Sequence, residues 1–397
     1  MSKYFDENIN RHGTHSVKWD MNEAIFGKAD VLPMWVADMD FASPQPVIEA
    51  LHQLVDSRIL GYSFAPDSLY DTIINWQTER HHLLLKKEDI LFSPGVVPSI
   101  AACIQALTQK GEAVMIQDPV YHPFADMVDM NERQLILSAL KIEDDQYKMD
   151  FVDIEKQIID QQVKLFILCN PHNPGGRVWS ADELTTLLNI CQKHHVKVIS
   201  DEIHNDLVYQ PNQFHSAVTL KESYASFVIT LAAPTKTFNL AGIKNSMLFI
   251  LDTDLREKIK LQQAKAEMSN INTFGYAATE AAFSKGSMWL DELMLYLTDN
   301  LDIICTFFDK ELPDVFYMRP QATYLLWFDC SSLGLEDDAL MEAFVTEGKI
   351  GLNAGISYGQ QGAQFMRFNF AAPRETVLEG LKRIKHVFDL HQGHPLS

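Results

Sequence analysis

The stretch that decides the fold reads Ala233-Pro234-Thr235-Lys236-Thr237-Phe238-Asn239-Leu240-Ala241-Gly242. It follows the apolar run Phe227-Val228-Ile229-Thr230-Leu231, which predicts a buried strand that ends at Pro234. Lys236 would then lie at the mouth of that strand. A poorly solvated lysine loses its proton more readily than a surface lysine, as an amine nucleophile requires. A loop lysine with its ammonium in water is the ordinary alternative.

Composition narrows the classes of function. The chain has 397 residues, of which 47% are hydrophobic and 22% charged, and this suits a soluble protein of two or three domains. A net charge of -20 repels nucleic acid and anionic membranes. The sequence starts without the apolar core of a signal peptide, and no run reaches the ~18 apolar residues of a membrane span. We therefore predict a cytoplasmic protein with neither kind of partner.

The cysteines and histidines do not indicate a metal site. Five cysteines are scattered along the chain without a C-x-x-C pair, which favours buried reduced thiols over a zinc site or disulfides. The histidine pairs lack cysteine or carboxylate companions at suitable spacing, so we interpret them as solvated side chains. These pairs are His12 and His15, His81 and His82, and His194 and His195.

Between residues 88 and 251, short apolar runs alternate with helical patterns near 97–109 and 181–194. Nearly continuous apolar strands separated by helices are typical of a mostly parallel sheet that is covered on both faces, so we predict an α/β fold. The predicted strands are Ile90-Leu91-Phe92, Ala113-Val114-Met115-Ile116, Leu165-Phe166-Ile167-Leu168, Val196-Lys197-Val198-Ile199 and Phe227-Val228-Ile229.

The flanking regions predict a second, smaller α+β domain. Its strands would be Tyr324-Leu325-Leu326-Trp327-Phe328 and Phe365-Met366-Arg367-Phe368-Asn369-Phe370. Residues 1–45 indicate an irregular arm whose apolar run from Met34 to Phe41 packs on its own domain or on a second subunit. We expect helices near 46–57 and 67–82 and one long polar helix over 252–285. The expected division is an arm at 1–45, a large domain at 46–285 and a small domain at 286–397.

Chemistry-bearing residues follow the strands, at the sheet edge where ligands bind in parallel sheets. Gly95, Val96 and Val97 form a glycine turn that opens a helix, which suits a phosphate, although a plain strand-to-helix turn would explain it too. Tyr121 could lie over a flat ligand or belong to the core. Asn173 belongs to the loop Asn170-Pro171-His172-Asn173-Pro174-Gly175-Gly176-Arg177, which is too specialised for a simple turn.

Asp201 and His204 follow the next strand. A carboxylate there is costly unless a cation meets it, and a protonated pyridine nitrogen is such a cation. A helix-capping aspartate with a spare histidine is the alternative. With Lys236, this edge offers a phosphate turn, a stacking ring, an amide, an acid and an amine, which together match the needs of pyridoxal phosphate.

The chain resembles fold-type I pyridoxal-phosphate enzymes of the aspartate-aminotransferase superfamily, in particular the MalY/PatB branch of cystathionine β-lyases (C–S lyases). The resemblance covers essentially the whole chain, and its most specific marks are the Asn-Pro-x-Asn-Pro loop, Asp201 and Lys236 in this order. The other matching segments are Met34 to Phe41, Gly61-Tyr62, Ser93 to Val97, Asp118-Pro119-Val120-Tyr121, Ser200 to His204, Ala233 to Gly242, and Arg367-Phe368-Asn369.

The resemblance implies the role of each residue. Lys236 would form the Schiff base and act as the base, Asp201 would pair with the pyridine nitrogen, and Asn173 would hold the ring oxygen. Tyr121 would stack on the ring, and the backbone at Gly95, Val96 and Val97 would bind phosphate. Arg367 would hold the substrate carboxylate. Tyr62 would reach the phosphate of a neighbouring subunit, which implies a homodimer with shared active sites.

This sequence departs from the superfamily pattern at three positions. His204 stands where aminotransferases usually carry tyrosine, while Ala233 and Lys244 replace a serine and an arginine that many members use. We expect Thr235 and Lys244 to supply the phosphate contacts instead. Trp35 and Phe41 could line the pocket for the sulfur substituent, or could simply pack.

The expected reaction is β-elimination of L-cystathionine, L-cysteine or another cysteine S-conjugate to pyruvate, ammonia and a thiol. One alternative is an aminotransferase with the same cofactor. Another is a regulatory protein that binds a protein partner and whose lyase activity is incidental.

Overall fold

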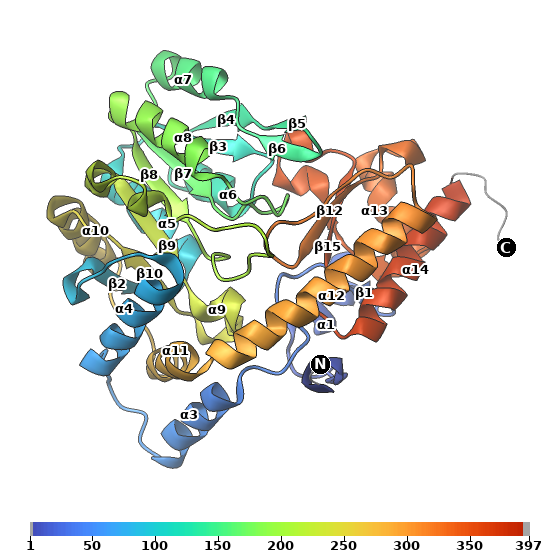
Figure 1. The fold of residues 1–397 in the computed structure, drawn as a ribbon, viewed down its shortest axis with the longest axis horizontal. Coiled ribbons are helices and arrows are strands. Elements are labelled where there is room, and N and C mark those ends of the chain that lie inside the picture. Colours follow the sequence, from blue (N-terminus) through green and yellow to red (C-terminus); the bar gives the residue numbers. More distant parts are fainter. Residues whose placement is uncertain (1–2, 392–397) are drawn as a thin grey trace.

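The computed structural model describes residues 3–391, and its centre is a seven-stranded sheet in the order β2-β10-β9-β8-β7-β3-β4 (Figure 1). Only β10 runs antiparallel to its neighbours, so the prediction of a mostly parallel sheet is confirmed. All five predicted strands of this sheet are present. The bounds are β2 (Ile90–Ser93), β3 (Ala113–Asp118), β4 (Gln134–Ala139), β7 (Leu165–Cys169), β8 (Lys197–Asp201), β9 (Val228–Ala232) and β10 (Ser246–Phe249).

Helices cover both faces because the central strands are apolar on both. Alternate residues of β7 belong to different cores: Leu165 and Ile167 pack with α5, α6 and α10, while Phe166 and Leu168 pack with α7 and α8. The predicted helices near 97–109 and 181–194 are α5 and α8. The bounds are α5 (Val96–Leu107), α6 (Pro123–Met130), α7 (Phe151–Asp160), α8 (Ala181–Lys193) and α10 (Thr253–Lys265).

A smaller antiparallel sheet in the order β11-β12-β15-β14 lies beside the large one (Figure 1). It contains both strands predicted in the last third of the chain. The bounds are β11 (Tyr317–Met318), β12 (Leu325–Asp329), β14 (Asn353–Ala354) and β15 (Phe365–Asn369), with helices α12 (Ser287–Glu311), α13 (Asp337–Thr346) and α14 (Arg374–His391). A separate hairpin joins β5 (Lys141–Glu143) to β6 (Gln146–Lys148). The domain division at residues 45 and 285 stays a prediction.

The prediction of one helix over 252–285 is wrong. Two helices, α10 and α11 (Thr273–Lys285), occupy this region and are separated at 266–272. The Asn272 side chain accepts a hydrogen bond from the Gly275 N–H at 2.8 Å, so it caps a new helix there. The long helix is instead α12, which reaches from beside α11 to the smaller sheet (Figure 1).

The N-terminal arm is more regular than predicted and packs on its own chain. It contains α1 (Val17–Asp20), α2 (Asn22–Phe26) and β1 (Leu32–Pro33), and β1 pairs in parallel with β13 (Ile350–Gly351). Met34, Met39 and Phe41 belong to the main core. Trp35, Val36 and Ala37 of the arm line the cavity that holds the candidate site.

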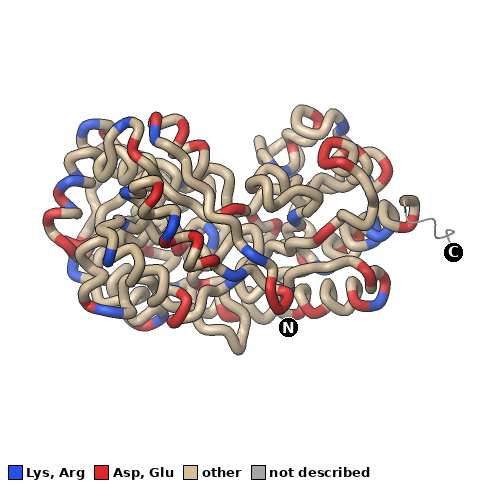
Figure 2. The backbone as a smooth tube through the Cα atoms, turned by 90° about the horizontal axis from the view of Figure 1, so that it is seen from above, with Lys and Arg blue, Asp and Glu red and all other residues tan. Residues whose placement is uncertain are grey.

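The helices predicted near 46–57 and 67–82 are α3 (Gln45–Asp56) and α4 (Asp67–His81). The segment between them, residues 57–66, exposes Ile59, Tyr62 and Phe64. Acidic and basic residues are spread along the whole tube in Figure 2 and gather in no single region. Over residues 3–391, every helix is too short or too polar to cross a lipid bilayer.

Candidate active site

A cavity of about 540 Å³ lies where the carboxyl ends of the large-sheet strands face β15 and the arm. It collects every residue predicted for the site except Phe41, which packs in the core, and Tyr62, which is fully exposed on the 57–66 segment. The predicted residues that line it are Trp35, Gly95, Val96, Val97, Tyr121, Asn173, Asp201, His204, Thr235, Lys236, Lys244 and Arg367.

Lys236 enters the cavity from α9 (Pro234–Thr237), a single turn directly after the fully buried strand β9. Its Nζ donates a hydrogen bond to the Ala37 carbonyl of the arm at 2.5 Å. Burial, aided by the positive charge of Arg367, lowers the pKa of the Lys236 amine to about 8. Near neutral pH, a minority of this amine is therefore unprotonated and nucleophilic, a far larger share than for a surface lysine.

Asp201 is the last residue of β8 and is 3% exposed. Its Oδ1 accepts a hydrogen bond from the Ile203 N–H at 3.1 Å. Burial raises the pKa of this carboxyl group to about 7, and Lys236 lowers it only in part. A buried acid in this state is stabilised as a carboxylate by any cation that enters the cavity beside it.

His204 lies in the cavity wall three residues after Asp201. Its Nδ1 is buried and has no hydrogen-bond partner within residues 3–391. Burial, together with the positive charges of Lys236 and Arg367, lowers the pKa of His204 to about 3. The His204 ring is therefore neutral near pH 7.

The start of α5 forms the anion-binding end of the cavity. Gly95 precedes the helix and supplies no side-chain cap, so the first N–H groups, at Val96 and Val97, point away from the helix without partners inside it. Lys244 and Thr235 line the same cavity. A dianion such as a phosphate monoester would find backbone donors, a hydroxyl and an ammonium here.

Arg367 on β15 is the most unusual charge of the site. It is 3% exposed, yet no carboxylate among the described residues pairs with it. Its Nη1 donates to Asn173 Oδ1 at 3.1 Å, and its Nη2 donates to the Trp35 carbonyl and to Asn353 Oδ1, both at 2.7 Å. Nε is buried without a partner. A fixed guanidinium without a counter-ion favours binding of a carboxylate ligand.

Sequence reasoning missed several residues of the cavity wall, among them Asn353, Tyr358 and His122. Asn353 stands opposite Arg367 in the register of β14 and β15, and the ring of Tyr358 lies 5.1 Å from the Arg367 guanidinium carbon. Of these three, only His122 is adjacent in sequence to a predicted site residue, Tyr121, and could have been found from it. Phe41, suggested for the pocket, instead packs in the core against Phe5.

Residues 29–384 match the protein family described as aminotransferase class I and II. The chain belongs to this family. Within the family it is 42% identical to cystathionine beta-lyase PatB of Bacillus subtilis (strain 168). This match spans 381 residues, which is 96% of this chain and 98% of that protein. It is 32% identical over 381 residues to protein MalY of Escherichia coli (strain K12), over 95% of this chain and 96% of that protein.

A solved structure shares the fold of this chain. Cystalysin from Treponema denticola, whose crystal structure contains a pyridoxal 5'-phosphate cofactor, superposes with a TM-score of 0.94 at 32% identity, over 98% of this chain and 99% of that one. The resemblance to the MalY/PatB branch that the motifs predicted is confirmed.

The groups in the cavity fit the cofactor that this family fold implies. Asp201 offers a buried carboxylate to a ring nitrogen, and Tyr121 offers an aromatic face. The Asn173 amide uses only Oδ1 within residues 3–391, so its Nδ2 is free to donate to a ring oxygen. Together with the anion end and the Lys236 amine, these groups match each part of pyridoxal phosphate.

Proposed function

We propose that this protein is a pyridoxal-phosphate-dependent carbon–sulfur lyase that cleaves cysteine S-conjugates by β-elimination, with L-cystathionine and L-cysteine among its substrates. Overall, one conjugate and one water would give a thiol, pyruvate and ammonium. One observation carries the proposal: an amine of lowered pKa, a buried acid and a guanidinium without a counter-ion line one cavity. The similarity to cystathionine beta-lyase PatB supports the reaction type.

The cofactor would be held from both ends. Asp201 would pair with its ring nitrogen, Tyr121 would lie against the ring, and Asn173 and His204 would approach the ring from the remaining sides. Pyridoxal phosphate supplies an electron sink for a carbanion at the substrate Cα when it is bound. The phosphate contacts would come from Gly95, Val96, Val97, Thr235 and Lys244.

Lys236 would carry the amine chemistry of the site. Its depressed pKa leaves it partly unprotonated near neutral pH, so this amine would hold the cofactor at its aldehyde group and would accept the Cα proton of the substrate. The Ala37 carbonyl, which also accepts a hydrogen bond from the Tyr324 hydroxyl at 3.0 Å, would anchor the ammonium that this proton transfer produces.

Arg367 would orient the substrate through its α-carboxylate. The contacts to Asn173, Asn353 and the Trp35 carbonyl keep the guanidinium plane fixed before the ligand arrives, which lowers the entropic cost of binding. A carboxylate held there would place the adjacent Cα within the same cavity as Lys236.

The working form would be a cytoplasmic homodimer with shared active sites. The 57–66 segment exposes Ile59, Tyr62 and Phe64, which is unfavourable for a segment that stays in water. In a dimer, this segment would be covered and Tyr62 would reach the phosphate end of the partner's cavity. All five cysteines are free and buried, as suits a reducing compartment.

The test separates a lyase from an aminotransferase. Purified protein incubated with pyridoxal phosphate should form pyruvate and a free thiol from L-cystathionine without any added keto acid, measured by coupled lactate dehydrogenase and a thiol reagent. Product formation that requires a keto acid and releases no thiol would replace the lyase by a transaminase. A protein that fails to bind the cofactor would contradict both.

A further inference from the structure

The proposed function gives every charged side chain of the cavity lining a partner on the cofactor or the substrate. The lining contains four, Asp201, Lys236, Lys244 and Arg367. In the proposed function they meet the ring nitrogen, the aldehyde, the phosphate and the substrate α-carboxylate. No lining side chain of residues 3–391 therefore remains as a counter-ion for a charge at the far end of the substrate side chain.

The two histidines of the lining do not supply a cation either. Burial lowers the pKa of His122, and the positive charge of Arg367 lowers it further, although Asp126 opposes both effects. The ring of His204 is neutral for the same reasons, with a pKa of about 3. Both imidazoles offer hydrogen bonds at neutral pH, and neither offers a full charge to a carboxylate.

The wall next to Arg367 is aromatic and continuous. Tyr358 lies over the guanidinium, its ring meets His122 edge to face at 5.8 Å, and His122 lies 5.4 Å from the ring of Tyr121. Trp35 of the arm adds a further ring to the lining of the same cavity. A substituent that extends from a substrate held by Arg367 would meet rings.

Trp35 is held in place from two sides. Its indole Nε1 donates to the Lys18 carbonyl at 3.2 Å, and its ring packs edge to face against Phe26 at 5.5 Å. A fixed aromatic surface stabilises an apolar substituent through buried area and dispersion. It leaves a carboxylate or ammonium desolvated without a partner, which is costly.

We propose that the preferred substrates are cysteine S-conjugates whose sulfur substituent is uncharged, either alkyl or aromatic. Substituents that end in a carboxylate, an ammonium or both, such as the far end of L-cystathionine, are poorer substrates. This inference rests on the proposed function, because the α-carboxylate contact to Arg367 decides which wall the substituent meets.

The binding test uses two amino acids that have no leaving group and differ only at the end of the side chain. L-Norleucine ends in a methyl group, and L-2-aminoadipate of the same chain length ends in a carboxylate. Calorimetric titration of the cofactor-loaded enzyme at pH 7.5 should show at least tenfold tighter binding of norleucine. Equal affinities, or tighter binding of aminoadipate, would overturn the inference.

The kinetic test pairs S-propyl-L-cysteine with S-(2-carboxyethyl)-L-cysteine and follows pyruvate. We expect kcat/KM to be at least tenfold higher for the propyl compound. Pyruvate from both compounds at equal efficiency would remove the substrate preference and leave the proposed lyase standing. Absence of pyruvate from both, and from L-cystathionine, would remove the lyase itself and this inference with it.

A matched pair of variants tests whether charge decides. His122→Lys adds a cation to the wall, and His122→Gln replaces the imidazole with an uncharged polar group. The ratio of the two dissociation constants should fall at least fivefold in His122→Lys and should stay within twofold in His122→Gln. An unchanged ratio in His122→Lys would show that the wall does not select by charge.

Discussion

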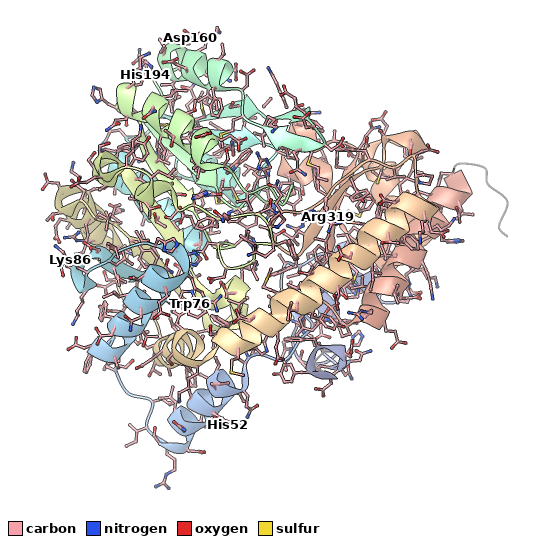
Figure 3. All side chains as sticks on the ribbon, in the orientation of Figure 1. His52, Trp76, Lys86, Asp160, His194 and Arg319 are labelled. Atoms are coloured by element: carbon pink, nitrogen blue, oxygen red, sulfur yellow. The ribbon has the colours of Figure 1, made fainter. Side chains whose placement is uncertain are left out.

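Thr237 Oγ1 donates a hydrogen bond to Asp206 Oδ2 at 2.8 Å, and Thr237 is the residue directly after Lys236. The same carboxylate accepts from His81 Nε2 at 2.8 Å and from Trp76 Nε1 at 3.1 Å, both on α4 (Trp76 is labelled in Figure 3). The interpretation of His81 as a solvated side chain is therefore wrong, because this histidine is buried against Asp206. Asp206 follows Asp201 by five residues. One buried acid therefore ties the turn that carries Lys236 to the segment that begins at Asp201.

We predict that Thr237→Val weakens this tie while Thr237→Ser preserves it. Valine has the shape of threonine without the hydroxyl, so a buried carboxylate loses one donor, at a cost of about 1–3 kcal/mol in the free energy of unfolding. Denaturant titration measures this cost. If the bond also positions Lys236, kcat should fall about tenfold in Thr237→Val and stay within twofold in Thr237→Ser. Equal kcat in the parent protein and both variants would mean that this hydrogen bond contributes to stability and does not position Lys236.

Asp201→Asn should make the protein without cofactor more stable at neutral pH. Burial raises the folded-state pKa of Asp201 from 3.8 to about 7, so the folded protein keeps this proton while the unfolded chain loses it. The resulting loss in the free energy of unfolding is absent below about pH 4, grows as the pH rises to 7, and is constant above pH 7. We expect the substitution, which removes the titrating group, to recover about 1–3 kcal/mol at pH 8 and nothing at pH 4.

Urea titrations of the cofactor-free forms of Asp201→Asn and the parent protein at both pH values check this expectation. The same variant should lose lyase activity by a factor of a hundred or more, because the ring nitrogen loses its anion. A variant that is less stable than the parent at pH 8 would contradict the view that Asp201 is held at an energetic cost.

Lys244 should contribute to cofactor affinity. It lines the cavity and has a φ of 56°, a left-handed conformation that asparagine tolerates better than alanine does. Lys244→Asn therefore removes the charge with little backbone strain. We expect its dissociation constant for pyridoxal phosphate to rise about tenfold, measured by fluorescence titration, and to lose part of its salt dependence. An unchanged dissociation constant would mean that the backbone N–H groups of α5 and Thr235 bind the phosphate without Lys244.

Arg367→Lys should separate charge from geometry at the substrate carboxylate. Lysine keeps the positive charge but cannot make the three fixed contacts of the guanidinium to Asn173, Asn353 and the Trp35 carbonyl. We expect KM for S-propyl-L-cysteine to rise at least thirtyfold and cofactor affinity to stay within threefold. A KM close to that of the parent would mean that the substrate α-carboxylate does not bind at Arg367.

The large sheet and its site could be predicted because one physical rule places them. Parallel strands end at one edge, so the residues after each apolar run had to meet there, and Tyr121, Asn173, Asp201 and Lys236 do. Two strands of this sheet, β4 and β10, were not predicted, and the pattern of apolar residues does not encode the antiparallel direction of β10.

The other half of the cavity was beyond such reasoning. Asn353 lies on β14, a strand of two residues that is too short for any periodicity, and it reaches the site only through its pairing with Arg367. Tyr358 follows in a short 3-10 turn. The helix break at 266–272 depends on the cap at Asn272, a local contact that the polar composition of 252–285 conceals.

Trp35→Ala should change substrate preference more than it changes catalysis. The carbonyl that holds Arg367 belongs to the backbone of Trp35, so the substitution removes the indole and keeps that contact. We expect kcat/KM for S-benzyl-L-cysteine to fall about tenfold, a loss of about 1.4 kcal/mol of transition-state stabilisation. For S-methyl-L-cysteine, which is too small to reach the ring, the change should stay within threefold. Trp35→Phe keeps an aromatic face and should retain most of the preference for the benzyl compound. Parallel losses for both substrates in Trp35→Ala would mean that the indole supports the arm and does not select the substituent.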